Sequence, residues 1–192
     1  MLSAVSQTLA LSAAALSLYI AVTGWSRSRG RVPAESERVV LAQVPTDADI
    51  LGTLHQMNVN EIKAAQLAET MSRNSDVRAL ASQIISDHTT LDQQTAALAA
   101  QLGITPTTGD STIARQGSAE LDNLRARNDG ATFDLAFSGT QVQDHMQALA
   151  LVASARRTAQ NVELKTALVR QIRPVIARHL QMAKSVRAGL GH

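Results

Sequence analysis

Cysteine is absent from the 192 residues, so the chain forms no disulfide, offers no thiolate to a metal and has no cysteine nucleophile. Aromatic residues make up only 2% of the chain, which leaves little to stack on nucleic-acid bases. The formal net charge is +2, and the arginines and glutamates of residues 26–43 account for all of it. A chain with neither a basic stripe nor stacking side chains is not expected to bind nucleic acid.

The sequence also has no Ser-His-Asp arrangement, glycine-rich phosphate loop or carboxylate pair that stands out from chance. These absences argue against a hydrolase and against a nucleotide cofactor. What is plentiful is Ala, Leu, Val and Ile, which build helical cores more readily than sheets when aromatic residues are scarce. We therefore expect an all-α fold, with Leu135 facing the core and Met71 and Met146 as core filler.

The first 25 residues carry no charged side chain and are nearly long and apolar enough to span a bilayer. We expect residues 1–25 to be a signal peptide or membrane anchor, residues 26–45 a flexible linker, and residues 46–190 the folded domain. Ordinary signal peptides have a basic residue before the apolar run, and this one does not. Arg27, Arg29 and Arg31, directly after it, would keep the domain of an uncleaved anchor in the cytoplasm. Export and inner-membrane anchoring both stay open.

Four long segments after Pro45 have apolar residues at helical spacing. They run from residue 46 or 47 to about 73, from a cap at residues 74–76 to 102, from about 131 to 160, and from 161 onward. A weaker helix, from 111 to about 127, lies between the second and third. Pro174 is expected to kink the last helix. Hairpin, crossover and second hairpin form the connectivity of a ferritin-like four-helix bundle.

One polar residue interrupts the apolar stripe of each long helix, and these residues are Glu61, His88, His145 and His179. Glu61 and His88 are equally far along the chain from the turn of the first hairpin, and His145 and His179 from the turn of the second. Antiparallel helices rise together at about 1.5 Å per residue, so the members of a pair should lie level, inside the core. One carboxylate and three neutral imidazoles suit a single Zn²⁺, and also iron, copper or manganese. The sequence thus predicts a mononuclear transition-metal site with Glu61, His88, His145 and His179 as ligands.

Two other arrangements are considered for these residues. A di-iron centre needs Glu-x-x-His on two helices, whereas the residue three positions before each histidine is aliphatic, so ferroxidase chemistry is not expected. A metal-free polar layer, in which histidine and glutamate bond to one another and fix the helix register, remains the alternative to the metal. Asp87 and Asp144 should point about 100° away from their histidines and act at most as partners of the ligands. His55 and His192 are expected to be solvated.

Short motifs occur in a familiar order along the domain: Asn60-Glu61-Ile62, Asp87-His88-Thr89, Phe133-Asp134 with Gln141-Val142 and His145, and Pro174 with His179-Leu180. In these motifs the chain, from about residue 47 to 186, resembles a bacterial family of unknown function. The members of that family have been labelled predicted outer membrane proteins and carry a ferritin-like domain. The resemblance implies a helical bundle exported to the cell envelope, and it implies no reaction.

Three function classes remain. The first is a cell-envelope protein, not an enzyme, that binds or buffers one transition-metal ion. The second is a mononuclear metalloenzyme that acts on a small oxidant, and the third is a metal-free helical module that binds a protein partner. An uncleaved segment of residues 1–25 would add the membrane as a partner.

Overall fold

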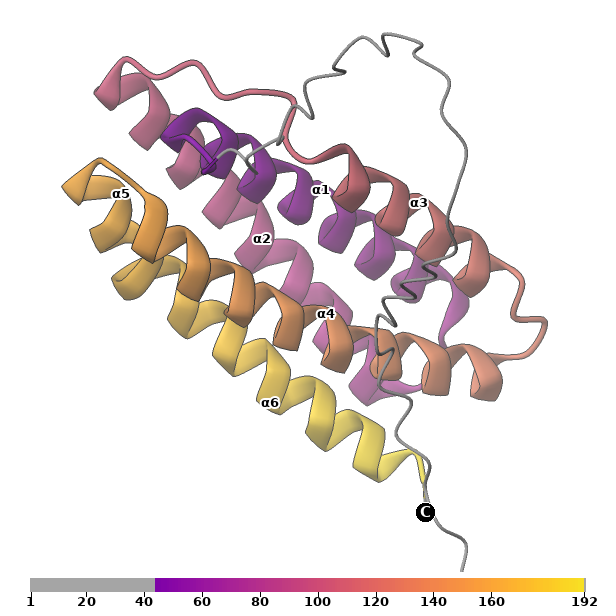
Figure 1. Cartoon of the computed structure of the whole chain (residues 1–192). Coiled ribbons are helices and arrows are strands. Elements are labelled where there is room, and N and C mark those ends of the chain that lie inside the picture. Colours follow the sequence, from indigo (N-terminus) through magenta and orange to yellow (C-terminus); the bar gives the residue numbers. More distant parts are fainter. Residues whose placement is uncertain (1–43, 192) are drawn as a thin grey trace, which may run out of the picture. The chain divides into compact units, whose positions relative to one another are not determined.

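The computed structural model describes residues 44–191, and every regular element in this part of the chain is a helix (Figure 1). The elements are α1 (Asp47–Met71), α2 (Ser75–Leu102), α3 (Ser111–Arg125), α4 (Gly130–Thr158), α5 (Val162–Ala167), the π-helical η1 (Leu168–Ile172) and α6 (Arg173–Gly189). The expected all-α fold is confirmed. The expected leader and nearly all of the expected linker lie outside the described residues. Within residues 44–191, no helix combines the length and the apolar character that crossing a membrane requires.

The helices begin where side chains accept hydrogen bonds from the free N–H groups of the first turn. The Thr46 hydroxyl accepts from the Asp49 N–H while the Asp49 carboxylate accepts from the Thr46 N–H, which is a capping box. The Asn74 side chain caps α2 by accepting from the Asp76 and Val77 N–H groups, and Gly103, with φ of 65°, ends the helix in the left-handed conformation. For α1, α2, α3 and α4, the first and last residues agree with the boundaries expected from the sequence to within two residues.

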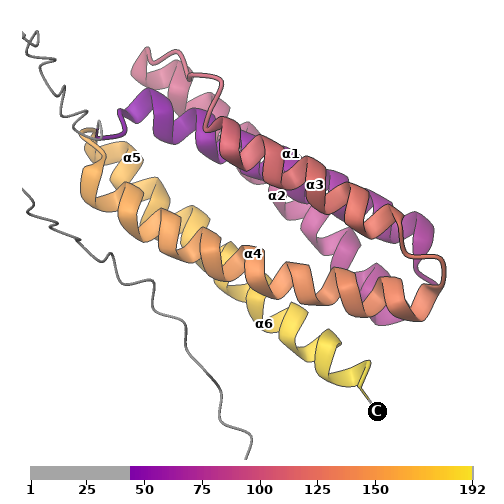
Figure 2. The same cartoon turned by 45° about the vertical axis from the view of Figure 1, so that its right-hand side comes forward.

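The helices pack as two pairs, α1 with α2 and α4 with α6, and the pairs contact each other through α1 with α4 and α2 with α6 (Figure 2). Helix α3 connects the pairs and lies along α1. The last helix expected from the sequence, from residue 161 onward, is interrupted by a π-helical turn and consists of α5, η1 and α6. Directly before α6 the chain makes a π-helical turn, in which the Arg173 N–H donates to the Leu168 carbonyl. Because the Pro174 ring would clash with the carbonyl four residues earlier in a regular helix, the wider turn accommodates the proline.

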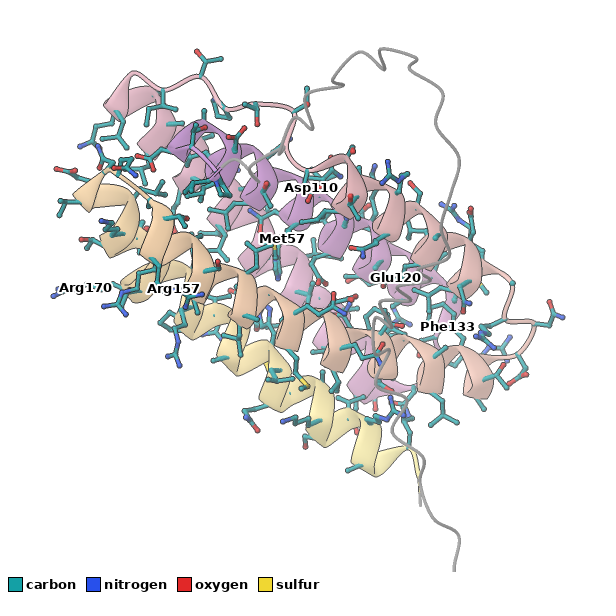
Figure 3. All side chains as sticks on the ribbon, viewed as in Figure 1. Met57, Asp110, Glu120, Phe133, Arg157 and Arg170 are labelled. Atoms are coloured by element: carbon teal, nitrogen blue, oxygen red, sulfur yellow. The ribbon has the colours of Figure 1, made fainter. Side chains whose placement is uncertain are left out.

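Two apolar clusters form the core, and Figure 3 labels Met57, which packs against one, and Phe133, which belongs to the other. On every long helix the two clusters use residues on opposite sides of the candidate site positions. In α2, for example, one cluster includes Ile84 and the other includes Leu91, with His88 between them. A layer of buried polar side chains therefore separates the two halves of the core.

Three residues expected in the core lie at the surface. Leu135 is 46% exposed, Met146 54% and Met71 37%. The buried face of α4 instead includes Phe133 and Phe137, both fully buried, and Leu135 lies two residues from each, on the opposite side of the helix. The two phenylalanines of the chain thus contribute more to the core than the composition suggests.

Candidate metal centre

His88, His145 and His179 meet in the polar layer, where they come from α2, α4 and α6. One ring nitrogen of each lies within 4.8 Å of the corresponding nitrogens of the other two. The ring centroids are 5.2 to 5.7 Å apart. All three side chains are buried, with exposures of 4%, 1% and 0%. The sequence-based expectation that these histidines converge is confirmed.

An oxygen acceptor fixes which nitrogen of His145 and of His179 carries the proton. Nδ1 of His145 donates to the backbone carbonyl of Gln141 at 2.9 Å, and a carbonyl oxygen only accepts. Nε2 of His179 donates to Oδ2 of Asp87 at 2.7 Å. In the neutral rings, Nε2 of His145 and Nδ1 of His179 are therefore unprotonated. These two nitrogens face each other at 3.3 Å, where their lone pairs repel unless a proton or a metal ion lies between them.

His88 follows the same pattern. Its Nδ1 donates to Oδ1 of Asn58 at 2.9 Å, so its Nε2 carries a lone pair. That Nε2 is buried and has no hydrogen-bond partner among the described residues. A buried nitrogen without a partner loses the hydrogen bonds that water would supply, which is rare in folded proteins. Each of the three histidines thus presents one unprotonated nitrogen.

Burial lowers the pKa of all three histidines, because the apolar surroundings disfavour the charged ring. The effect is largest for His88, where burial and the charges of His145 and His179 lower the pKa to about 3. At neutral pH the rings are neutral. A proton is therefore a poor candidate to bridge the facing lone pairs.

Asp87 connects His179 to the surface of the molecule. Besides His179, its Oδ2 accepts hydrogen bonds from Nη2 of Arg178 at 2.6 Å and from Nε2 of Gln83 at 2.8 Å. Burial alone would raise the pKa of Asp87, but these hydrogen bonds together hold it below the usual value. Asp87 is thus an ionised acceptor that orients His179. Its expected role as partner of a metal ligand stays a prediction.

Glu61 lies beside His145. Its Oε2 accepts from Nε2 of Gln141 at 3.0 Å, and its Oε1 is 3.8 Å from Nδ1 of His145. Because Nδ1 is the protonated nitrogen, the described conformation places Glu61 on the outer side of the ring rather than with the three converging nitrogens. Burial raises the pKa of Glu61 to about 7. Its assignment as a metal ligand stays a prediction.

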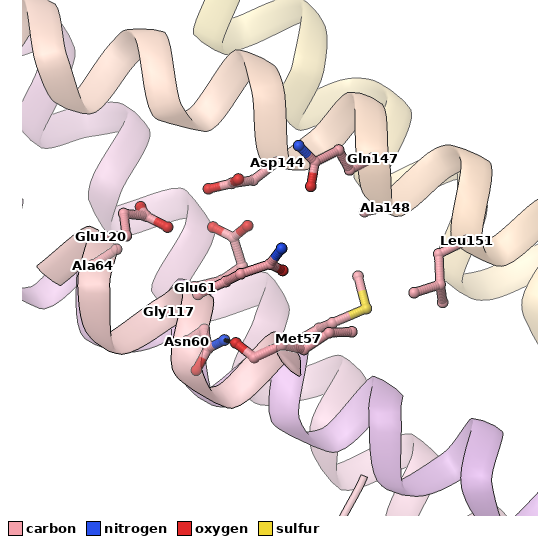
Figure 4. A pocket seen from close by; sticks show the side chains of 12 residues that line it. Met57, Asn60, Glu61, Ala64, Gly117, Glu120, Asp144, Gln147, Ala148 and Leu151 are labelled. Carbon is pink, nitrogen blue, oxygen red and sulfur yellow. Dashed lines mark hydrogen bonds between the residues drawn. The ribbon is translucent and has the colours of Figure 1, made fainter. Parts of the chain in front are cut away.

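The Glu61 carboxyl also lines a pocket of about 90 Å³ between α1, α3 and α4. Figure 4 shows the carboxyls of Glu61, Glu120 and Asp144 pointing toward one another in this pocket. Burial raises the pKa of Glu120, and the neighbouring Asp144 charge raises it further. Burial and the Glu61 charge likewise raise the pKa of Asp144. Asp144, expected to be a partner of His145, instead faces this carboxyl cluster.

Sequence reasoning gave no role in the site to Asn58, Gln141 or Glu120, although Gln141 belongs to one of the motifs of the family resemblance. Asn58 and Gln141 carry a usable signal, since they lie three residues before Glu61 and four before His145, on the same helix faces. Glu120 carries none, because it belongs to the crossover helix, whose position over the site depends on tertiary packing. His55 is exposed as expected, and its Nδ1 lies 2.8 Å from Oδ1 of Asp92.

Comparison with known proteins gives one match. Residues 32–186 match the family described as a domain of unknown function, DUF4142. This stretch contains the three clustered histidines His88, His145 and His179, and the match agrees with the expected membership of a family of unknown function. No curated protein matches the chain, and no solved structure matches it.

Proposed function

The chain belongs to this family of unknown function, and we propose that its domain binds one transition-metal ion through Nε2 of His88, Nε2 of His145 and Nδ1 of His179. One observation carries the proposal: the opposite nitrogen of each ring is bonded to an oxygen acceptor, so that three unprotonated nitrogens are left to converge. Carboxylate and carbonyl oxygens in this role are the usual partners of metal-bound histidines.

The spacing of the nitrogens supports the proposal. Two nitrogen ligands at about 2.05 Å from a tetrahedral zinc ion are about 3.3 Å apart. Nε2 of His145 and Nδ1 of His179 are separated by 3.3 Å. A cation at this position would remove the repulsion between the lone pairs, and the carboxylate of Asp87 would offset part of its charge. Imidazole suits zinc, iron and copper, and manganese is a further candidate, so the proposed role is to bind or buffer such an ion.

Three histidine ligands leave a fourth position for water or for Glu61 after a rotation of its side chain. Three protein ligands and one water are typical of catalytic rather than structural zinc sites. This count favours, as a second candidate, a mononuclear metalloenzyme that acts on a small oxidant. Steady turnover of such a molecule by the metal-loaded protein would distinguish this role from metal binding alone.

The proposal includes a fold and a location. Two helix pairs joined by a crossover that contains α3 support a ferritin-like four-helix bundle. The uncharged apolar residues 1–25 support export to the cell envelope. The alternative is an inner-membrane anchor with the domain in the cytoplasm. An alkaline phosphatase fusion after Gln43 tests the location, because that enzyme is active only outside the cytoplasm, and an inactive fusion would favour the alternative.

The metal itself is tested by stripping the full chain with a chelator and titrating it with Co²⁺, whose visible absorption reports its ligands. We expect one Co²⁺ per chain, and loss of most of the uptake in His88→Ala, His145→Ala and His179→Ala. His55→Ala is the matched control and should bind as the wild type does, because His55 is exposed and lies outside the site. Circular dichroism shows whether each variant is folded. A folded wild type that takes up no metal would leave the metal-free polar layer in its place.

A further inference from the structure

The three histidines are enclosed, and two groups of polar side chains lie next to them in the described part of the chain. One is formed by Asp87, whose side chain is 19% exposed. There Nη2 of Arg178 lies 2.6 Å from the Asp87 carboxylate, so a positive charge covers this side. The other group lines the pocket between α1, α3 and α4, and its Glu61 has Oε1 3.8 Å from Nδ1 of His145. Only the second group has no basic residue in its lining.

The pocket collects carboxyl groups from three helices, Glu61 from α1, Glu120 from α3 and Asp144 from α4 (Figure 4). None of the described residues that line it is basic. Oε1 of Glu120 is buried and has no hydrogen-bond partner in the described part of the chain. Burial raises the pKa of all three carboxyls, and His145 beside the pocket lowers only that of Asp144. Because no basic residue lines the pocket, the negative charge that appears when the carboxyls lose their protons would be left for an external cation to neutralise.

Acidic residues alone would not identify a ligand, and the additional observation is the histidine cluster behind the pocket. There Nε2 of His88, in a side chain 4% exposed, has no partner among the described residues. The His145 ring stands between the two features. Its Nδ1 faces Glu61, and its Nε2 faces His179. A cation that leaves Glu61 therefore has one imidazole ring to pass before it meets unprotonated nitrogens.

We propose that this pocket is the entrance by which a divalent transition-metal cation reaches the three histidines. The arriving ion displaces to the solvent the protons that burial keeps on these carboxyls. Oxygens of Glu120 and Asp144 then replace part of its water shell, and Glu61 passes it to the histidines. This inference rests on the proposed metal site and adds to it the chemical class of the incoming species and its route. Like charges repel and opposite charges attract across such a pocket, so the route admits cations and disfavours anions.

The test measures the rate at which the chelator-stripped full chain takes up Co²⁺ in a stopped-flow instrument at low ionic strength. Glu120→Gln should slow uptake on the order of tenfold, because an amide cannot release a proton and offer the ion a negative oxygen, and Glu120→Lys should slow it further, because a positive charge in the pocket repels the cation. The final Co²⁺ spectrum should be reached later but be the same. Glu69→Gln is the matched control, since Glu69 is an exposed glutamate of α1 outside the pocket, and its uptake rate should equal that of the wild type.

A second measurement needs no variant. Wild-type uptake should slow as salt rises from about 0.01 to 0.5 M, because salt screens the attraction. Equal uptake rates in wild type, Glu120→Gln and Glu69→Gln, or a rate independent of salt, would overturn the entrance while leaving the metal site intact. A wild type that binds no Co²⁺ would overturn the metal site and the entrance together. The two failures are therefore distinguishable.

Discussion

At the scale of single residues, each histidine of the cluster depends on one oxygen acceptor. The carbonyl of Gln141 belongs to the backbone and keeps its position as long as α4 is intact. Asp87 is different, because its side chain holds His179 while it also accepts from Arg178 and Gln83. Of the side chains that contact the ligands, Asp87 is therefore the most informative one to change.

Asp87→Asn should weaken Co²⁺ binding by about 10-fold to 100-fold, the usual loss when such a partner is replaced. The amide has no negative charge, and its NH₂ group can donate to Nε2 of His179, which would place the proton of that ring on Nδ1. Competition against a chelator of known affinity measures the change. Asp92→Asn is the control, because Asp92 lies on the same helix as Asp87 but contacts exposed His55 of α1. Equal affinities in both variants would show that Asp87 does not orient a ligand.

Glu120 should make the stability of the metal-free protein depend on pH. Burial raises its pKa above the ordinary value of 4.5, so the folded state keeps a proton that the unfolded state has lost. The stability contributed by Glu120 is complete below pH 4.5 and is lost as pH rises through the raised pKa. Glu120→Gln cannot ionise, so its free energy of unfolding should exceed that of the wild type by about 1–3 kcal/mol at pH 8 and by less at pH 5. Urea denaturation at the two pH values, with Glu69→Gln as control, checks this, and a difference that does not grow with pH would contradict it.

At the scale of helices, local sequence predicts most of what the structure shows. Caps such as Thr46 and Asn74 act through hydrogen bonds a few residues away, so the helix starts can be read directly. The π-helical turn before Pro174 could not be placed, because the proline signals only that the regular helix is disturbed. The position of α3 is likewise set by distant contacts, in particular the hydrogen bond from Asn60 of α1 to the Ile113 carbonyl.

The contact between α1 and α3 predicts the sign of a glycine substitution. A Cβ atom on Gly117 of α3 would lie 2.3 Å from Cγ and Nδ2 of Asn60, which its bond to Ile113 holds in place. Gly117→Ala should therefore destabilise the protein by about 1–3 kcal/mol, although alanine normally favours a helix. Gly130→Ala is the control and should be neutral or stabilising, because nothing lies within 4 Å of the added atom. Chemical denaturation measures both, and a stabilised Gly117→Ala would show that α3 packs less closely than described.

At the scale of the whole molecule, the polar layer lies between two apolar clusters to which all the long helices contribute. The sequence predicted that His88, His145 and His179 converge, because the two polar residues of each hairpin lie at the same height along their antiparallel helices. When two such hairpins pack together, these residues meet in one layer. It did not predict how the carboxyls divide, with Asp87 bonded to a histidine and Asp144 facing Glu120. That division depends on side-chain rotation and on α3, which helical periodicity does not specify.

Because the proposed site would draw its ligands from three helices, metal binding should stabilise the whole fold. At a free metal concentration of about 1,000 times the dissociation constant, the stabilisation is about 4 kcal/mol. A chelator should therefore lower the melting temperature of the loaded protein, and scanning calorimetry measures the shift. His179→Ala, without a complete site, should melt at the same temperature with and without the chelator. An equal chelator effect in the wild type and in His179→Ala would place the metal elsewhere.

The most direct test of the three-histidine site is the X-ray absorption spectrum of the zinc-loaded full chain, because its fine structure counts imidazole ligands and gives their distances. We predict three histidine nitrogens at about 2.0–2.1 Å and one oxygen ligand from water or a carboxylate. Zinc surrounded by oxygen ligands alone, or a protein that retains no zinc after loading, would contradict the assignment of His88, His145 and His179 as the metal ligands.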